Sequence, residues 1–292
     1  MPADVPGGEV GPRYPPGTSA GRPGPARVDG MRSPPAALVR TGGRALADLV
    51  LPRTCAGCAV PGADLCRRCR ALLARPQLAQ PRRHPPGFPP TVAAGAYAGP
   101  VRPAVNAFKE HGRAELARPL GRALALAVAA VLSAVPEAGP GGVLLVPVPS
   151  SAAAVRRRGR DHVRELADAA CAELRIAGLP ARTTRLLGRG TGRRVRDSAG
   201  LDAVQRRANL AGRFRVQPVR GSLLRGSRLV LVDDVVTSGA TLTEAARALR
   251  AVSDVSCLEA DTPVLAAVVA ATPRRDGWTL PVAGTGAFTV RG

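Results

Sequence analysis

Apolar residues follow two periods along the chain, and the two periods alternate between residues 91 and 272. Leucine, valine and alanine at intervals of three and four residues predict amphipathic helices, and short continuous apolar runs predict buried strands. Strands that alternate with helices are typical of a parallel α/β sheet. We therefore expect an open, mainly parallel sheet flanked by helices, with helical stripes at 116–135, 163–174 and 242–249 and strands at 143–148, 228–232 and 264–270.

The rest of the chain does not follow this alternation. Its first residues are rich in Pro and Gly without an apolar period, which is typical of a disordered extension. A short helix is expected over Ala36–Val50, and closely spaced prolines further on predict a linker with polyproline character. The sequence thus divides into a disordered extension (1–35), a helix with a four-cysteine segment (36–75), the linker (76–90), the α/β domain (91–272) and a weakly patterned tail (273–292).

No membrane insertion and no export signal are expected. The longest apolar run, Ala123–Val135, is too short to cross a bilayer and suits a buried helix. The first thirty residues lack the charged and then apolar pattern of a signal peptide. We therefore expect a cytoplasmic protein in a reducing compartment, where cysteines are more often thiolates than disulfides.

Composition narrows the choice of core and partners. Aromatic residues make up only 2% of the chain, so Ala, Leu and Val must build the core. The formal net charge of +21 favours polyanionic or phosphate-rich partners. The arginines between Arg182 and Arg215 suggest either a track for a polyanion such as single-stranded DNA or a solvated basic face. Because every basic residue except Lys109 is arginine, a bias over the whole chain weakens the first interpretation, as does the shortage of aromatic side chains for base stacking.

The most specific local pattern is an apolar strand that runs into two adjacent carboxylates, Asp233 and Asp234. A loop of small and hydroxyl residues follows at Thr237–Thr241, and Thr241 and Glu244 have the spacing of a capping box that predicts a helix start. A helix N-terminus, hydroxyl donors and a glycine that lets the backbone approach a ligand together predict a monophosphate site. Carboxylates at a strand end can bind a vicinal diol and help hold a divalent cation. An ordinary strand–loop–helix connection is the alternative.

Four cysteines form two Cys-x-x-Cys pairs, Cys55 with Cys58 and Cys66 with Cys69. Each pair can supply two thiolates to one tetrahedral Zn2+. Two disulfides or a redox pair are the alternatives, and the expected reducing compartment favours zinc. A unit this small cannot bury a core of its own, so the metal would supply its stability. Metal loss is therefore expected to unfold residues 50–72 alone.

The stretch Val230–Thr241 resembles the 5-phosphoribosyl-1-pyrophosphate (PRPP) motif of type I phosphoribosyltransferases. Further segments follow the order found in one branch, the ComF/GntX (competence protein F) family. These are the four cysteines, a lysine segment at Val105–Gly112, a Pro-Val-Pro strand end with an arginine-rich loop at Val146–Gly159, and an Arg…Asn-Leu…Phe segment at Arg207–Phe214. The order of these motifs between Ala36 and Ala271 makes the resemblance more specific than any single match.

This resemblance implies a type I phosphoribosyltransferase fold with an N-terminal zinc segment. It implies that Asp233 and Asp234 bind the ribose hydroxyls as the catalytic pair and that Mg2+ enters with the pyrophosphate. The reaction would displace pyrophosphate from ribose C1 by a nitrogen nucleophile, with Mg2+ and basic side chains stabilising the departing group. The residues expected to bind PRPP are Thr237, Ser238, Gly239, Ala240, Thr241, Lys109, Arg156, Arg158 and Gly159.

Two positions depart from the family patterns. Thr237 stands where purine-salvage members carry an aspartate base, which argues against a purine-salvage activity. ComF relatives usually have Arg-Gly-Phe-Asn-Gln after the Pro-Val-Pro strand, and this chain has Arg158-Gly-Arg-Asp-His162, so the roles of Asp161 and His162 stay open.

The single lysine, Lys109, suggests a site at the pyrophosphate that needs a compact ammonium, with chance survival as the alternative.

Two hypotheses follow. In the first, the protein is a ComF-family phosphoribosyltransferase that moves phosphoribose to an unknown nitrogen acceptor and is associated with DNA uptake during competence. In the second, the same fold senses PRPP or a nucleotide, or handles single-stranded DNA, without transferring anything. The acceptor and the oligomeric state do not follow from the sequence, and DNA-uptake proteins or a second copy in a homodimer stay open as partners.

Overall fold

The computed structural model of the protein describes residues 53–81, 85–134, 142–190, 212–218, 224, 226–253 and 263–273. The chain divides into two compact units, Met1–Leu49 and Val50–Gly292, and all described residues belong to the second. The expected disordered extension, the expected helix over Ala36–Val50 and the tail after residue 273 lie outside the described residues.

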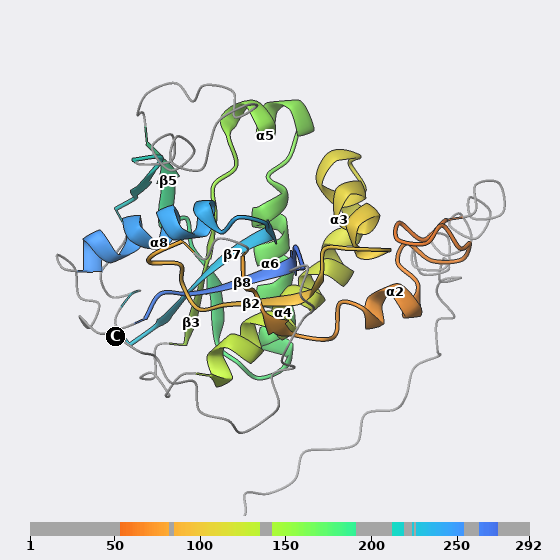
Figure 1. Cartoon of the computed structure of the whole chain (residues 1–292), viewed down its shortest axis with the longest axis horizontal. Helices are drawn as coiled ribbons and strands as arrows, with labels where there is room; N and C mark the ends of the chain where they lie inside the picture. Colours follow the sequence, from red (N-terminus) through yellow and green to blue (C-terminus); the bar gives the residue numbers. More distant parts are fainter. Residues whose placement is uncertain are drawn as a thin grey trace, which may run out of the picture. The chain divides into compact units, whose positions relative to one another are not determined.

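A six-stranded sheet in the order β1-β2-β8-β7-β3-β4 forms the centre of this unit (Figure 1). Every neighbouring pair is parallel except β1 with β2. The expected mainly parallel sheet is therefore confirmed. Its strands are β1 (Gln77–Leu78), β2 (Thr91–Ala96), β3 (Val143–Pro147), β4 (Ala181–Thr183), β7 (Arg228–Val236) and β8 (Leu265–Ala271), and β5 (Leu187–Arg189) and β6 (Phe214–Val216) form a separate antiparallel ribbon.

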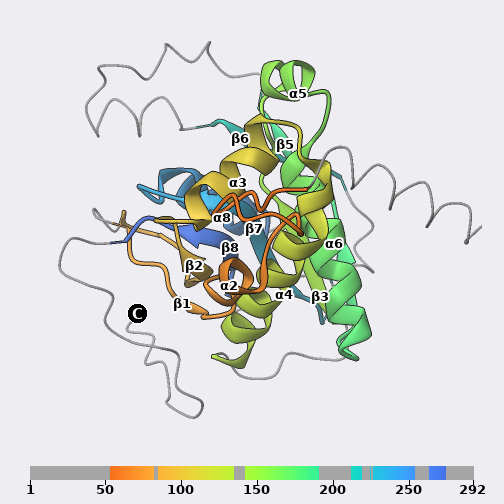
Figure 2. The ribbon, with the colours of Figure 1, turned by 90° about the vertical axis from the view of Figure 1, so that its right-hand side faces the viewer.

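Helices cover both faces of the sheet, because successive apolar side chains along its strands point to opposite faces and both faces must be buried. In β7, Val230 and Val232 join the buried cluster of α3, α4 and α6, whereas Leu229 and Leu231 join the cluster of α8. Figures 1 and 2 show α8 on one side of the sheet and α4 and α6 on the other. The helices are α2 (Arg67–Ala71), α3 (Val101–Glu110), η1 (Ala114–Leu116), α4 (Ala117–Ser133), α5 (Ala152–Arg158), α6 (His162–Ile176) and α8 (Ala240–Ser253).

The three expected helical stripes are confirmed as α4, α6 and α8, and the three expected strands as β3, β7 and β8. β7 is longer than expected, because Val235 and Val236 pair with Ala270 and Ala271 of β8. This pairing continues the strand past the two aspartates. The carboxylates therefore lie in the last part of a strand rather than in the loop that follows it.

The proline-rich stretch and the cysteine segment both pack against the sheet. Residues 77 and 78 form β1, which is too short to show a period in the sequence, and Phe88 packs against the apolar cluster of α8. Cys55 and Cys69 belong to the same buried cluster as α3 and α4. The domain boundaries expected at residues 76 and 91 therefore do not coincide with a gap in the packing.

The longest helical stretch in the described part of the chain is a core helix. Residues Ala114–Ser133, which comprise η1 and α4, are long and apolar enough to cross a membrane by length and composition. More than half of this apolar window is buried inside the fold, where α4 packs against β2, β8 and α6. Burial against a sheet and a second helix accounts for its apolar composition.

Candidate functional site

Asp234 of β7 is a buried carboxylate with three partners. Its Oδ2 atom lies 2.8 Å from Nζ of Lys109 and 3.0 Å from Nε2 of His162. Its Oδ1 atom accepts a hydrogen bond from the backbone N–H of Val235 at 2.7 Å. Both oxygens are therefore engaged within the protein before any ligand is considered.

The two adjacent aspartates have opposite electrostatic environments. Burial opposes ionisation of Asp234, but the hydrogen bond with His162 and the charge of Lys109 lower its pKa below the usual range. Burial and the neighbouring charge of Asp234 raise the pKa of Asp233 well above its ordinary value. No basic side chain among the described residues forms an ion pair with Asp233, whose Oδ1 accepts the backbone N–H of Asp234 at 2.9 Å. Asp233 is therefore the carboxylate that is free to meet a ligand.

Polar contacts between α3, α5 and α6 hold Lys109 and His162 in place. Glu110 accepts two hydrogen bonds from Arg158, from Nη2 at 2.6 Å and from Nε at 3.1 Å. Nη1 of Arg158 lies 3.4 Å from Nδ1 of His162. An arginine can only donate and a carboxylate can only accept, so Nδ1 is the acceptor and Nε2 carries the proton that faces Asp234.

Arg160 fixes the turn between α5 and α6. Its guanidinium lies 4.2 Å from the centre of the Phe108 ring, its Nη1 donates to the Phe108 carbonyl at 3.1 Å, and it also pairs with Glu165. The Phe108 ring meets His162 edge-on, with 6.3 Å between the ring centres. Asp161 caps the N-terminus of α6 with its side chain. Asp161 and His162, whose roles the sequence left open, thus cap a helix and contact Asp234.

Sequence reasoning missed Glu110, Arg160 and the pairing of His162 with Asp234. Nothing in the spacing shows that α3, the start of α6 and the end of β7 meet, because parallel topology brings them together. The one available signal was the histidine directly after a potential N-cap aspartate, at a position where this chain departs from the ComF pattern.

The candidate phosphate loop, residues 237–241, comprises the connection between β7 and α8 and the first two residues of α8. Thr237 and Ser238 are exposed, Gly239 is buried, and α8 begins at Ala240. Oγ of Ser238 lies 3.5 Å from the backbone N of Ala240. Two exposed hydroxyls therefore stand at the N-terminus of a fourteen-residue helix, an arrangement suited to a monophosphate.

The capping box predicted for Thr241 and Glu244 is wrong. The helix begins before Thr241, so this residue lies inside the first turn and its side chain is past the capping position. Glu244 accepts the backbone N–H of Gly212 at 2.8 Å and two hydrogen bonds from Arg247 at 2.8 and 2.9 Å. Its carboxylate thereby joins α8 to the β5–β6 ribbon.

Gly239 is required by a contact inside the protein. A Cβ atom at this position would lie 2.8 Å from the Phe88 ring and 2.9 Å from Pro81. Arg250 of α8 also donates to the carbonyl of Gly87 at 3.0 Å. The sequence predicted a close backbone approach to a ligand at Gly239, and the structure places the protein's own proline-rich segment against it.

The arginines expected to bind the phosphates of PRPP differ in whether a carboxylate of the protein already binds them. Arg158 is bound to Glu110, and Arg157 lies 3.7 Å from the same carboxylate. Gly159 ends α5 with a φ of 69°, a left-handed conformation that suits glycine. Arg156 is exposed and forms no ion pair with any residue that the structure describes. Of the arginines expected to bind PRPP, Arg156 is therefore the one without a competing carboxylate.

The sulfurs of Cys55, Cys58, Cys66 and Cys69 all lie within 4.8 Å of one another. Four thiolates around one tetrahedral Zn2+ stand about 3.8 Å apart, and the sulfurs of Cys58 and Cys66 are 3.6 Å apart. Burial opposes ionisation of Cys55, but backbone N–H groups, first that of Cys66, lower its pKa to about 6. These four cysteines are free thiols in the structure, and their arrangement fits a zinc ion.

The two aspartates at the end of β7 would supply few oxygen ligands to a magnesium ion. Mg2+ usually binds one or two carboxylates together with substrate phosphates. Both oxygens of Asp234 are engaged by the protein, so Asp233 is the carboxylate that would approach the ion. The site fits a magnesium ion that the ligand's own oxygens largely coordinate.

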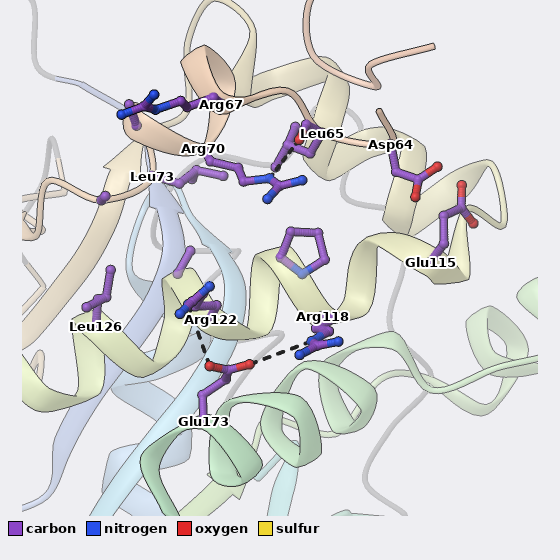
Figure 3. Close-up of a pocket in the computed structure, with 14 residues that line it drawn as sticks. Asp64, Leu65, Arg67, Arg70, Leu73, Glu115, Arg118, Arg122, Leu126 and Glu173 are labelled. Atoms are coloured by element: carbon purple, nitrogen blue, oxygen red, sulfur yellow. Dashed lines mark hydrogen bonds and ion pairs between the residues drawn. The ribbon is translucent and has the colours of Figure 1, made fainter. Parts of the chain in front are cut away.

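A cavity of about 660 Å³ lies between the cysteine segment and α4 (Figure 3). Arg70 points into it from α2, and Arg118 and Arg122 approach Glu173 at 3.9 and 3.6 Å. None of its lining residues belongs to the phosphate loop or to the contacts around Asp234. The cavity is therefore not part of the candidate site.

The family model of the phosphoribosyl transferase domain matches residues 193–276. The matched region contains β6, β7 with both aspartates, the phosphate loop, α8 and β8. No curated protein matches the chain. Asp233, Asp234 and residues 237–241 thus lie in a region similar to a phosphoribosyl transferase domain, whereas Lys109 and His162 lie outside the matched residues. The mainly parallel sheet is consistent with the type I phosphoribosyltransferase fold.

Proposed function

We propose that the protein binds PRPP at the end of β7 and transfers its phosphoribosyl group to a nitrogen acceptor. The observation that carries this proposal is the position of Asp233 and Asp234 directly before a phosphate loop at a helix N-terminus, inside the region similar to a phosphoribosyl transferase domain. Asp233 accepts hydrogen bonds from the ribose hydroxyls. The hydroxyls of Thr237 and Ser238 and the backbone N–H groups of Gly239, Ala240 and Thr241, at the start of α8, hold the 5-phosphate.

Asp234 acts in this proposal through its partners. Its charge holds the ammonium of Lys109, which is partly exposed, beside the ribose. The transfer breaks the bond between ribose C1 and the pyrophosphate oxygen and forms a bond from C1 to the acceptor nitrogen. Lys109 and Arg156 stabilise the negative charge that develops on the departing pyrophosphate, and a bound Mg2+ would neutralise part of the same charge.

A second candidate function is binding without transfer, as in a sensor of PRPP or of a nucleotide. The observation that favours it is Thr237, which stands where purine-salvage enzymes carry a base. Asp234 cannot substitute for that base while Lys109 and His162 share its Oδ2 atom. A role in handling single-stranded DNA would use the basic segment 182–215, of which residues 191–211 lie outside the described part of the chain.

The wider assignment to the ComF/GntX family is also a proposal. It is supported by the order of motifs in the sequence and by the cysteine cluster, which would hold a structural Zn2+. On this assignment the protein is cytoplasmic and works with DNA-uptake proteins during competence.

Calorimetric titration of PRPP, with and without Mg2+, tests the proposed function. We expect binding that needs Asp233 and is at least tenfold weaker in Asp233→Asn, because this substitution removes the negative charge and replaces one of the two acceptor oxygens by a donor. Pyrophosphate release measured with a panel of nitrogen bases then separates transfer from binding. No PRPP binding by the wild type would refute both phosphoribosyl transfer and PRPP sensing at this site.

A further inference from the structure

Two half-buried arginines lie at the end of the β5–β6 ribbon, Arg189 in β5 and Arg213 directly before β6. Arg189 is opposite Phe214 in the antiparallel register, with 5.9 Å between its guanidinium and the ring centre. Its Nε donates to the carbonyl of Pro149 at 3.2 Å. The Nε atom of Arg213 is buried and has no hydrogen-bond partner among the described residues.

Neither arginine forms an ion pair with any carboxylate in the part of the chain that the structure describes. Burial lowers the pKa of Arg189 to about 10, and the positive charge of Arg213 acts in the same direction. Burial also lowers the pKa of Arg213. By contrast, the similarly buried Arg158 and Arg160 each bind a glutamate. Two like charges that are removed from water without a counterion destabilise the fold unless a bound anion compensates them.

The arginine pair is attached to two parts of the proposed PRPP site. Arg189 contacts Pro149, which lies between β3 and α5. Gly212, directly before the second arginine, donates its N–H to Glu244 of α8 at 2.8 Å. The carboxylate of Glu244 also receives two hydrogen bonds from Arg247, so it is already paired. The pair therefore stands between the end of β3 and the helix that carries the phosphate loop.

We propose that Arg189 and Arg213 form a second anion-binding site, distinct from the phosphate loop, for a phosphate or carboxylate group other than the ribose 5-phosphate. Guanidinium groups match the oxygens of both kinds of anion with paired, charge-assisted hydrogen bonds. This site rests on the proposed function, which places the ribose phosphate at the loop. Two different molecules could supply such an anion: the pyrophosphate that leaves ribose C1, or an acceptor that carries an acidic group.

Three probes test this site on the full chain at constant ionic strength. Inorganic pyrophosphate and pyridine-3-carboxylate report on the arginine pair, and ribose 5-phosphate reports on the phosphate loop. We expect the wild type to bind at least one of the first two probes, with an affinity at least tenfold lower in Arg189→Gln and in Arg213→Gln. Ribose 5-phosphate affinity should change less than twofold. Arg215→Gln is the matched control, because Arg215 lies on β6 and is exposed, and it should leave all affinities unchanged.

Thermal unfolding gives a second readout that does not depend on a ligand. An unpaired, half-buried guanidinium does not stabilise the fold, so Arg213→Met should have a Tm at or above that of the wild type without anions. The same variant should lose the rise in Tm that the binding probe gives the wild type. A Tm well below the wild-type value would show that Arg213 is structural and would overturn the proposal.

The outcomes separate this inference from the proposed function. If neither anionic probe binds the wild type, or if the substitutions leave its affinity unchanged, the second site does not exist. Binding of pyrophosphate supports the leaving group as occupant, and binding of the carboxylate supports an acidic acceptor. If ribose 5-phosphate fails to bind while anion binding still depends on both arginines, the proposed function falls and the anion site stands.

Discussion

Asp233 and Asp234 differ because strand alternation turns them toward different faces of the sheet. Val230 and Val232 face the cluster of α3, α4 and α6, and the same period turns Asp234 toward Lys109 and His162. Asp233 follows Leu229 and Leu231 at two-residue intervals, and these leucines face α8, the helix that follows the candidate phosphate loop. Asp234 therefore anchors a cation from the protein, and Asp233 is the position that the proposed ligand would contact.

Asp233→Asn should raise stability while it removes ligand binding. A raised pKa in the folded state means that an acid loses stability as the pH rises through that value. Above the unfolded pKa of about 4 the unfolded state releases this proton while the folded state tends to keep it, so the carboxyl group lowers the stability of the ligand-free protein at pH 7, and the amide removes this penalty. We expect a Tm about 2–4 °C above the wild type at pH 7 and a smaller difference at pH 5, measured by thermal unfolding without PRPP. A lower Tm at pH 7 would contradict this account.

Asp234→Asn should have the opposite effect. A lowered pKa means that the ionised carboxylate contributes stability above its unfolded pKa of about 4, and that this contribution is lost as the pH falls further. The amide leaves Lys109 and His162 without their shared charge, so we expect a loss of about 2–3 kcal/mol at pH 7. Urea unfolding at several pH values measures it. The variant should also show a flatter fall in stability below pH 4, and a stability curve parallel to that of the wild type would rule this out.

At the scale of elements, α4 and α6 pack more closely than ordinary side chains permit. A Cβ atom on Gly121 of α4 would lie 2.4 Å from the Cβ of Ala169 and 3.1 Å from the backbone of α6. A rigid helix backbone cannot yield as the end of a flexible side chain can. The glycine therefore sets the distance between the two helices that cover one face of the sheet.

Gly121→Ala should destabilise the protein, although alanine favours helix formation by about 1 kcal/mol over glycine. The added methyl group forces α4 away from α6, and we expect a net loss of about 2 kcal/mol in the free energy of unfolding. Arg122→Ala, at the next and largely exposed position, is the matched control and should change stability by less than about 0.5 kcal/mol. Denaturant unfolding measures the free energy of unfolding of both variants. If Gly121→Ala were as stable as Arg122→Ala, α4 and α6 could move apart without cost.

The elements with a clear period could be predicted from the sequence, and the contacts between them could not. The stripe of α4 and the apolar run of β3 are long enough to show their periods. β1 has two residues and β5 has three, so neither has a period to detect. Lys109 was singled out because it is the chain's one lysine, but its partner Asp234 is 125 positions away and is reached only through the sheet topology.

At the scale of the whole described unit, the cysteine segment contacts α3 at both ends. A Cβ atom on Gly57 would lie 2.8 Å from the carbonyl oxygen of Pro100, the residue that precedes α3. Arg113, after the end of α3, donates to the carbonyl of Thr54 at 2.9 Å. The same helix carries Lys109 to Asp234. A path of packed residues therefore joins the cysteine cluster to the proposed PRPP site.

Removal of metal from the cysteine cluster should therefore weaken PRPP binding as well as unfold the cysteine segment. Loss of the ion frees four thiols that share a buried cluster with α3, so hydrogen exchange should rise in α3 together with residues 53–73. A chelator selective for Zn2+ over Mg2+ allows PRPP titration of the stripped protein, and we expect at least a tenfold loss of affinity. Cys58→Ser should reproduce this loss, whereas Cys171→Ala, which changes a buried cysteine that is not one of the four clustered cysteines, should not. Unchanged affinity, with faster exchange confined to the cysteine segment, would show that this segment is a separate unit.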